Sequence, residues 1–84
     1  MSEKKKVRKI VKLVFPQKLI KEPVTYEMAI RYDVVPNIRR AKVTETVGEV
    51  ILELDGGEKN IEEGIKYLIK LGVTVEPIEG DIVD

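Results

Sequence analysis

The stretch NIRRAKVTETVGEVILELD, residues 37–55, decides the fold of this chain. In its second half the aliphatic residues Val50, Leu52 and Leu54 alternate with mostly acidic ones, which is the period of a strand with one buried face. Its first half carries a similar pattern, and the connection through Gly48 is short enough to imply an antiparallel hairpin. The sequence therefore predicts two paired strands, residues 37–45 and residues 49–55.

The segment before the hairpin predicts a strand and a helix. Residues 7–15 alternate in the same way and end at Pro16. Pro23 suits the first turn of a helix that runs to about Tyr32 and is followed by a turn through Pro36. Three residues are expected to share the apolar face of that helix: Tyr26, Ala29 and Ile30.

The segment after the hairpin predicts a second helix and a fourth strand. A pair of glycines, Gly56 and Gly57, ends the third strand, and Asn60 with Glu63 has the spacing of a capping box at a helix start. Gly72 is the expected helix stop, and residues 73–78 form the last strand. The apolar face of this helix is expected to contain Ile61, Ile65, Leu68 and Ile69.

The order β-α-β-β-α-β most economically forms an α+β, ferredoxin-like sandwich, in which two helices cover one face of a four-stranded antiparallel sheet. With 84 residues the chain is long enough for one small domain, residues 1–84. We expect its core to span about residues 7–78 and its ends, 1–6 and 79–84, to be flexible tails.

The composition argues against several kinds of chemistry. The chain has no Cys and no His, so we expect no metal site, no cysteine-held iron–sulfur cluster and no other cofactor. No nucleophile can be paired with a base, so we expect no catalytic residues and no enzyme activity. No apolar run approaches the roughly 20 residues of a membrane span, and we expect a cytoplasmic protein without direct membrane insertion.

Charge is unevenly distributed, although the net charge is zero. Residues 1–42 carry twelve Lys and Arg against four Asp and Glu, whereas residues 43–84 carry three against eleven. A basic half can indicate a nucleic-acid surface. If the halves interleave in one sheet, however, opposite charges become cross-strand neighbours. The three tyrosines fall on helices, so the aromatic platform of an RNA-binding sheet is missing and we expect no nucleic-acid partner.

The alternation also assigns the two faces of the sheet. If Val11, Val50 and Ala41 face the helices, the open face carries four aliphatic side chains among charges of both signs: Ile10, Val14, Ile38 and Ile51. This patch is the predicted interface of a homodimer or the cover of a ligand, and simple exposure is the alternative. Arg39 falls on the helix side, where we expect it at the strand end with its side chain passing a helix to reach solvent.

Asn37 lies where the loop becomes a strand. On chemistry alone, the simplest interpretation is that its side-chain amide satisfies the turn after Pro36. The alternative is a contact with a ligand.

Three segments in this order and spacing resemble the NIL domain family: Asn37-Ile38 at a strand start, Gly48 to Gly56, and Ile65 to Glu76. The resemblance covers about residues 7–78. The family is named for Asn-Ile-Leu, and this chain has Asn37-Ile38-Arg39, so a cation replaces the third, aliphatic residue.

The resemblance implies a ferredoxin-like domain that works as an appendage. In one group of the family it is the C-terminal regulatory domain of methionine-importer ATPase subunits, where it pairs with a copy of itself and binds methionine to inhibit transport. In another group it precedes ferredoxin-type iron–sulfur modules linked to sulfur amino-acid metabolism, and Phe15-Pro16 and residues 75–78 look more like that group. The chain is then expected to be a free-standing member or an excised piece.

Two functions follow from the residues and the resemblance together. The first is a regulatory sensor, a homodimer that binds an amino acid such as methionine through Asn37, Ile38 and Arg39 and has a transporter as its partner. The second is a module without a ligand, which docks an iron–sulfur protein or another enzyme through the open sheet face or an edge strand.

Overall fold

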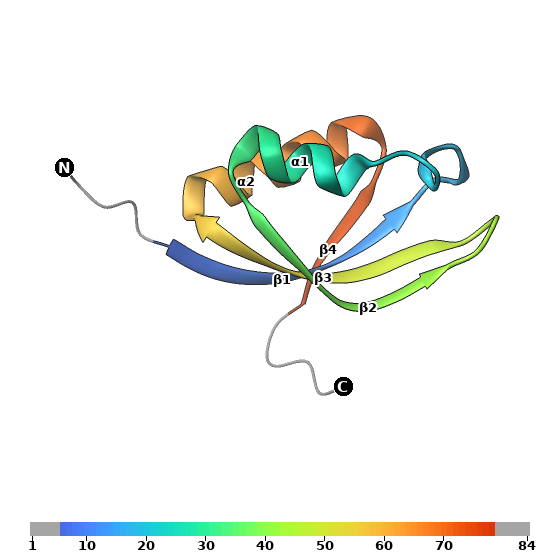
Figure 1. The fold of residues 1–84 in the computed structure, drawn as a ribbon, viewed down its shortest axis with the longest axis horizontal. Helices are drawn as coiled ribbons and strands as arrows, with labels where there is room; N and C mark the ends of the chain where they lie inside the picture. Colours follow the sequence, from blue (N-terminus) through green and yellow to red (C-terminus); the bar gives the residue numbers. More distant parts are fainter. Residues whose placement is uncertain (1–5, 79–84) are drawn as a thin grey trace.

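The computed structural model describes residues 6–78 of the chain. Strands and helices follow each other in the predicted order, with a short 3-10 helix after the first strand (Figure 1). The elements are β1 (Lys6–Phe15), η1 (Gln17–Leu19), α1 (Val24–Tyr32), β2 (Val35–Val43), β3 (Gly48–Gly57), α2 (Glu58–Leu71) and β4 (Thr74–Ile78). Of the predicted tails, residues 1–5 and 79–84 lie outside the described residues, whereas Lys6 belongs to β1.

The four strands form one antiparallel sheet in the order β2-β3-β1-β4. The strand that comes first in the sequence, β1, is therefore central, and β2 and β4 are the edges. Both helices lie over the same face of the sheet and leave the other face open (Figure 1). The protein is a ferredoxin-like α+β sandwich, so the predicted fold class is confirmed.

The core lies between the sheet and the helices. Every second residue of the two central strands faces it, and Leu13, Leu52 and Leu54 are fully buried. The helices contribute Val24, Met28, Ile61 and Leu68. Because full burial of one such side chain is worth about 1.5–3 kcal/mol, this single layer supplies most of the hydrophobic stabilisation of a domain this small.

The buried face of α1 differs from the predicted one. Tyr26 and Ile30 are 64% and 62% exposed, and Val24 and Met28 face the core instead. The reason lies in α2, where Gly64 leaves room for Met28: a Cβ atom added at Gly64 would lie 2.9 Å from the Met28 sulfur. Which face of α1 is buried thus depends on the position of a small residue in α2. The periodicity of the α1 sequence alone does not contain that information.

The start of α2 also differs from the prediction. β3 continues through Gly56 and Gly57, and Gly57 is the N-cap residue of a helix that begins at Glu58 without a side-chain cap hydrogen bond. Asn60 therefore lies inside the first turn, and the predicted capping box does not form. The partner expected for it, Glu63, instead has a carboxylate oxygen 3.7 Å from the Lys66 ammonium nitrogen.

The end of α2 is as predicted. Gly72 follows the helix with φ 110°, a left-handed conformation that glycine adopts at little cost, and its N–H donates to the Ile69 carbonyl. Ile61 and Leu68 of the predicted apolar face are fully buried, whereas Ile69 is 54% exposed. The chain then turns directly into β4.

Candidate functional site

A β-bulge in β2 sets the geometry of the candidate site. The pairing with β3 advances from Ile38 opposite Leu52 to Arg40 opposite Ile51, so Arg39 is the extra residue. Residues directly opposite each other in an antiparallel pair project to the same face. Ile38 therefore shares the helix side of the sheet with buried Leu52, and Arg40 shares the open face with Ile51.

Two predicted face assignments are wrong because of this bulge. Ile38 does not belong to the open-face patch, since it lies on the helix side of an edge strand, where it is 64% exposed. Arg39 does not pass a helix, because its Nη1 donates a hydrogen bond of 3.2 Å to Oε1 of Glu53. Arg40 and Lys42 lie on the open face, as predicted.

Glu53 is the charged centre of the open face. Its side chain is only 9% exposed, and both of its oxygens lie next to arginines: Oε1 accepts a hydrogen bond from Arg39 Nη1, and Oε2 forms a salt bridge of 2.7 Å with Arg8 Nε. Arg8 Nε also lies 2.9 Å from Oδ1 of Asp55. The hydrogen bond to Asp55, with the negative charges of Asp55 and Glu53, raises the pKa of the Arg8 guanidinium above its ordinary value, so it stays charged. A shielded carboxylate is tolerated here because an arginine next to each oxygen offsets the cost of removing the charge from water.

These contacts account for the uneven charge of the sequence. The two arginines come from the basic half of the chain, and the carboxylates that bind them come from the acidic half. Two further pairs of opposite charge face each other across strands, Lys12 with Glu76 and Lys42 with Glu49. The interpretation that the two halves neutralise each other within one sheet is confirmed for these pairs.

Asn37 lies inside β2, directly opposite Glu53. Because the strand begins at Val35, the interpretation of Asn37 as a turn residue is wrong. Asn37 is exposed on the open face and is the cross-strand neighbour of Glu53, which forms an ion pair with Arg39. The structure thus brings two of the three predicted ligand contacts together and places the third, Ile38, on the other side of the sheet.

Sequence reasoning did not single out Glu53 or Arg8. The available signal was positional: Glu53 lies in the middle of a predicted strand, where a carboxylate flanked by neighbouring strands is shielded and needs a partner. In β1, the strand next to β3, Arg8 is a cation that projects to the same face of the sheet as Glu53.

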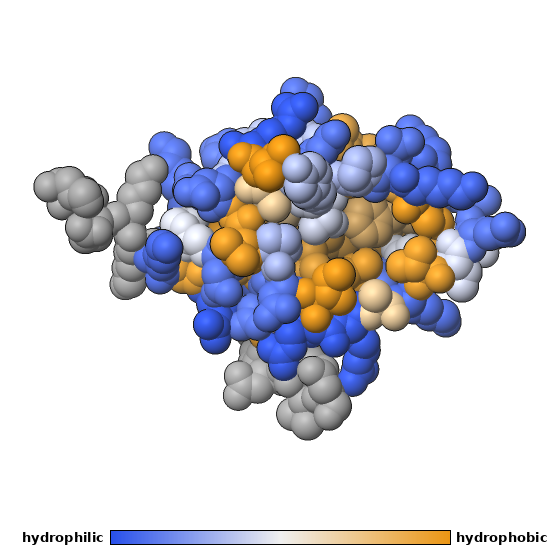
Figure 2. All heavy atoms as spheres, in the orientation of Figure 1, coloured by the Kyte–Doolittle hydropathy of each residue, from blue (hydrophilic) through white to orange (hydrophobic). Residues whose placement is uncertain are grey.

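Of the predicted patch, Ile10, Val14 and Ile51 lie on the open face, each half-buried. Ile78 joins them because β4 places it opposite Ile10, and the exposed Val35 joins them because it pairs with Asp55. Figure 2 shows hydrophobic residues in several clusters among hydrophilic ones. Away from the open face, the exposed apolar side chains of α1 and β2 are Tyr26, Ile30, Ile38 and Val43. The open-face interface of a homodimer stays a prediction, and this second apolar surface is an alternative to it.

Residues 6–78 contain no group of three or more Asp or Glu side chains placed to hold a metal ion. Neither described helix combines the length and the apolar character that crossing a membrane requires.

Comparison with known proteins identifies the family. The model of the NIL domain matches residues 9–77. A solved structure, the C-terminal domain of an ABC transporter / ATP-binding protein from Enterococcus faecalis, is 32% identical, with a TM-score of 0.77 over 87% of this chain and 86% of that chain. No curated protein matches the chain. The family model covers most of the sequence, and the solved domain shares both its fold and a third of its residues, so the chain belongs to the NIL domain family.

Proposed function

We propose that this chain is a non-catalytic regulatory domain, which senses an amino acid such as methionine as a cytoplasmic homodimer and acts on a transporter. The similarity to a C-terminal domain of an ABC transporter / ATP-binding protein supports the regulatory role and the transporter partner. The observation that supports a ligand here is that the exposed Asn37 is the cross-strand neighbour of Glu53, which forms an ion pair with Arg39.

This arrangement suits the two charges of an amino acid. Arg39 offers donors to the carboxylate, Glu53 offers acceptors to the ammonium, and the Asn37 amide can do both. Ile10 and Ile51 share the same face and supply apolar contact for the side chain of the ligand. Ile38 lies on the helix side of the sheet, so its part in the predicted site is confined to its backbone.

The edges of the sheet favour a homodimer through the open face. Each edge strand contains a proline, Pro36 in β2 and Pro77 in β4. Proline has no N–H to donate, and β2 adds the bulge at Arg39, so pairing of either edge with a second copy is disfavoured. A second copy then covers the aliphatic residues of the open face, each Å² of apolar area contributing about 25 cal/mol before the costs of association.

Calorimetric titration with methionine, homocysteine and cysteine tests the ligand. Asn37→Ala should weaken binding at least tenfold, because each hydrogen bond to a charged ligand group is worth about 1.5–3 kcal/mol. Asn60→Ala, at an amide on the far side of the molecule, is the matched control and should leave binding unchanged. No heat and no shift in melting temperature at millimolar ligand would rule out the sensor, since a ligand that binds only the folded state must stabilise it.

The second candidate is a docking module, an accessory of a ferredoxin-type iron–sulfur protein in sulfur amino-acid metabolism. It is favoured by the apolar surface along α1 and β2, where Tyr26 and Ile38 are both 64% exposed. An exposed patch of this kind is typical of a protein interface. It becomes the leading function if all three amino acids fail to bind.

A further inference from the structure

Lys9 interrupts the apolar row that β1 presents to the helices. The residues of that row are Val7, Lys9, Val11, Leu13 and Phe15, and Lys9 is the charged member. It lies opposite Leu54, which is fully buried, so its aliphatic stem starts within the apolar layer. A lysine at this parity is unusual, because inward positions of a central strand are apolar in a sheet with one covered face.

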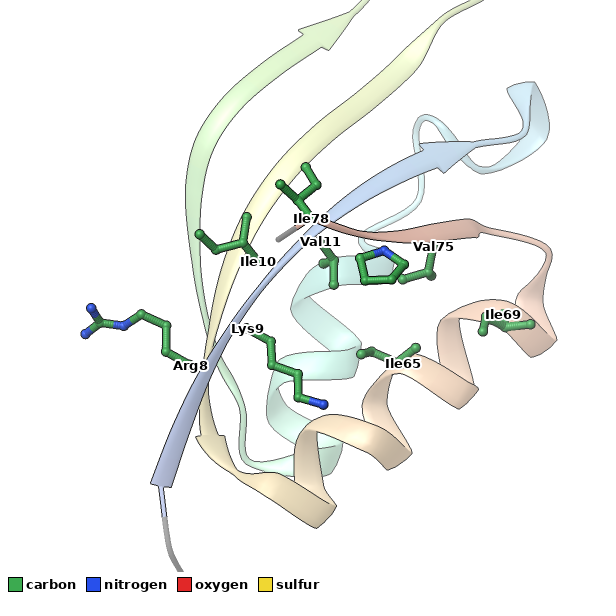
Figure 3. Close-up of a pocket in the computed structure, with 9 residues that line it drawn as sticks. Arg8, Lys9, Ile10, Val11, Ile65, Ile69, Val75 and Ile78 are labelled. Atoms are coloured by element: carbon green, nitrogen blue, oxygen red, sulfur yellow. The ribbon is translucent and has the colours of Figure 1, made fainter. Parts of the chain in front are cut away.

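A pocket lies beside Lys9, next to the last described residues of β4. β4 pairs with β1 from Val14 to Ile10, where Ile78 is the last described partner. The pocket has a volume of about 690 Å³ and lies between β1, β4 and α2 (Figure 3). Its volume lies within the range of about 300–1,000 Å³ that is typical of small-molecule sites.

The pocket has apolar walls and a cation. On the helix side its lining is aliphatic apart from Lys9: Val11, Ile65, Ile69, Val75 and Pro77. Figure 3 shows the Lys9 side chain extending from β1 toward α2, where Ile65 lies, whereas Arg8 and Ile10 point away from the helices. The ammonium of Lys9 is therefore presented to the apolar lining and not to the ion pairs of the open face.

Lys9 forms no salt bridge with any of residues 6–78, in contrast to Arg8 on the other side of the same strand. Lys9 is a partly buried residue beside aliphatic side chains. An anion bound to its ammonium accepts a charge-assisted hydrogen bond. Apart from Lys9, the side chains that line the pocket on the helix side are aliphatic, so we expect the anion to carry apolar surface as well.

We propose that this pocket binds an aliphatic monocarboxylate, with the carboxylate on the Lys9 ammonium and the hydrocarbon chain along Ile65 and Ile69. The site lies on the helix side of the sheet, so it is separate from Asn37 and does not depend on the proposed function. A purely structural role for Lys9, as an inward charge that disfavours pairing of β1 with other strands, is the alternative that the experiment distinguishes.

The test is a titration of the full chain with octanoate, followed by amide chemical shifts in two-dimensional NMR. We expect saturable shifts at residues 9, 65 and 69, and at least tenfold weaker binding by Lys9→Met, which keeps the unbranched stem and removes the charge. Lys12→Met, on the open face of the same strand, is the matched control and should bind octanoate like the parent chain. Octylamine, with the same chain and the opposite charge, should bind at least tenfold more weakly than octanoate.

A second variant keeps the result interpretable if Lys9→Met unfolds. Ile69 is 54% exposed, so Ile69→Glu should be tolerated and should repel the carboxylate. Absence of shifts at millimolar octanoate, or equal binding by Lys9→Met and its control, would overturn the proposal and leave Lys9 as an inward charge that disfavours pairing with other strands. Asn37→Ala should bind octanoate normally, so failure of the amino-acid sensor and failure of this pocket are separate results.

Discussion

At the scale of single residues, the charge of Glu53 holds together the ion pairs of the open face. Removing its charge weakens two ion pairs, one with Arg39, which is only partly exposed, and one with Arg8. We expect Glu53→Gln to lower the free energy of unfolding by about 1–3 kcal/mol, because hydrogen bonds to charged groups are lost in a shielded position. Urea denaturation followed by circular dichroism measures this change.

Glu49→Gln is the matched control for Glu53→Gln. Glu49 is in the same strand and on the same face, but its cross-strand neighbour Lys42 is exposed. A pair of this kind is worth about 0–1 kcal/mol. Equal losses for the two variants would mean that Glu53 behaves as an ordinary surface charge despite its burial.

At the scale of elements, the sequence was sufficient to predict each helix or strand that is defined by its own hydrophobic periodicity. The alternation of residues 49–55 predicted a strand there and separated the residues that face the helices from those on the open face correctly. The bulge was missed, although the three-residue spacing between Ile38 and Ala41 breaks the alternation of β2 and was a signal for it. The candidate site depends on that one extra residue, so its contacts were less predictable than the fold around it.

The packing of α1 on α2 gives a prediction that belongs to the helix pair. In the parent chain, Gly64→Ala gains helix propensity of about 1 kcal/mol but forces Met28 to move, since the new Cβ would lie 2.9 Å from its sulfur. We expect the substitution to be neutral or destabilising. In a Met28→Ala background the same substitution should be stabilising, because the obstacle is gone.

Urea denaturation of the four chains in this double-mutant cycle gives the coupling between the two positions, which we expect to be about 1 kcal/mol. Met28→Ala alone should cost about 2–5 kcal/mol. An effect of Gly64→Ala that is the same in both backgrounds would show that the two helices do not depend on this close approach.

At the scale of the whole molecule, two apolar surfaces compete to be the interface of the proposed homodimer. Ile51 is at the centre of the open face, and Ile30 is exposed on α1. We expect Ile51→Lys to give a monomer in light scattering at high micromolar concentration, because a lysine cannot be buried there without a partner. Ile30→Lys should leave the dimer intact. The reverse result would show that the homodimer interface is the surface along α1 and β2. A parent chain that is monomeric would exclude both surfaces as homodimer interfaces.

The central place of β1 also has a consequence for synthesis on the ribosome. β1 precedes every other described element, yet its sheet partners are β3 and β4, and β4 is the last of them to be made. Until Ile78 has emerged, the nascent chain can form the β2–β3 hairpin and its helices, but the middle of the sheet cannot close on both sides. Closure of long-range pairings is the slow step in folds of this kind. The apolar side chains of β1 are therefore not fully covered until the later elements of the domain have been made, and we expect this strand to be a binding segment for a ribosome-associated chaperone.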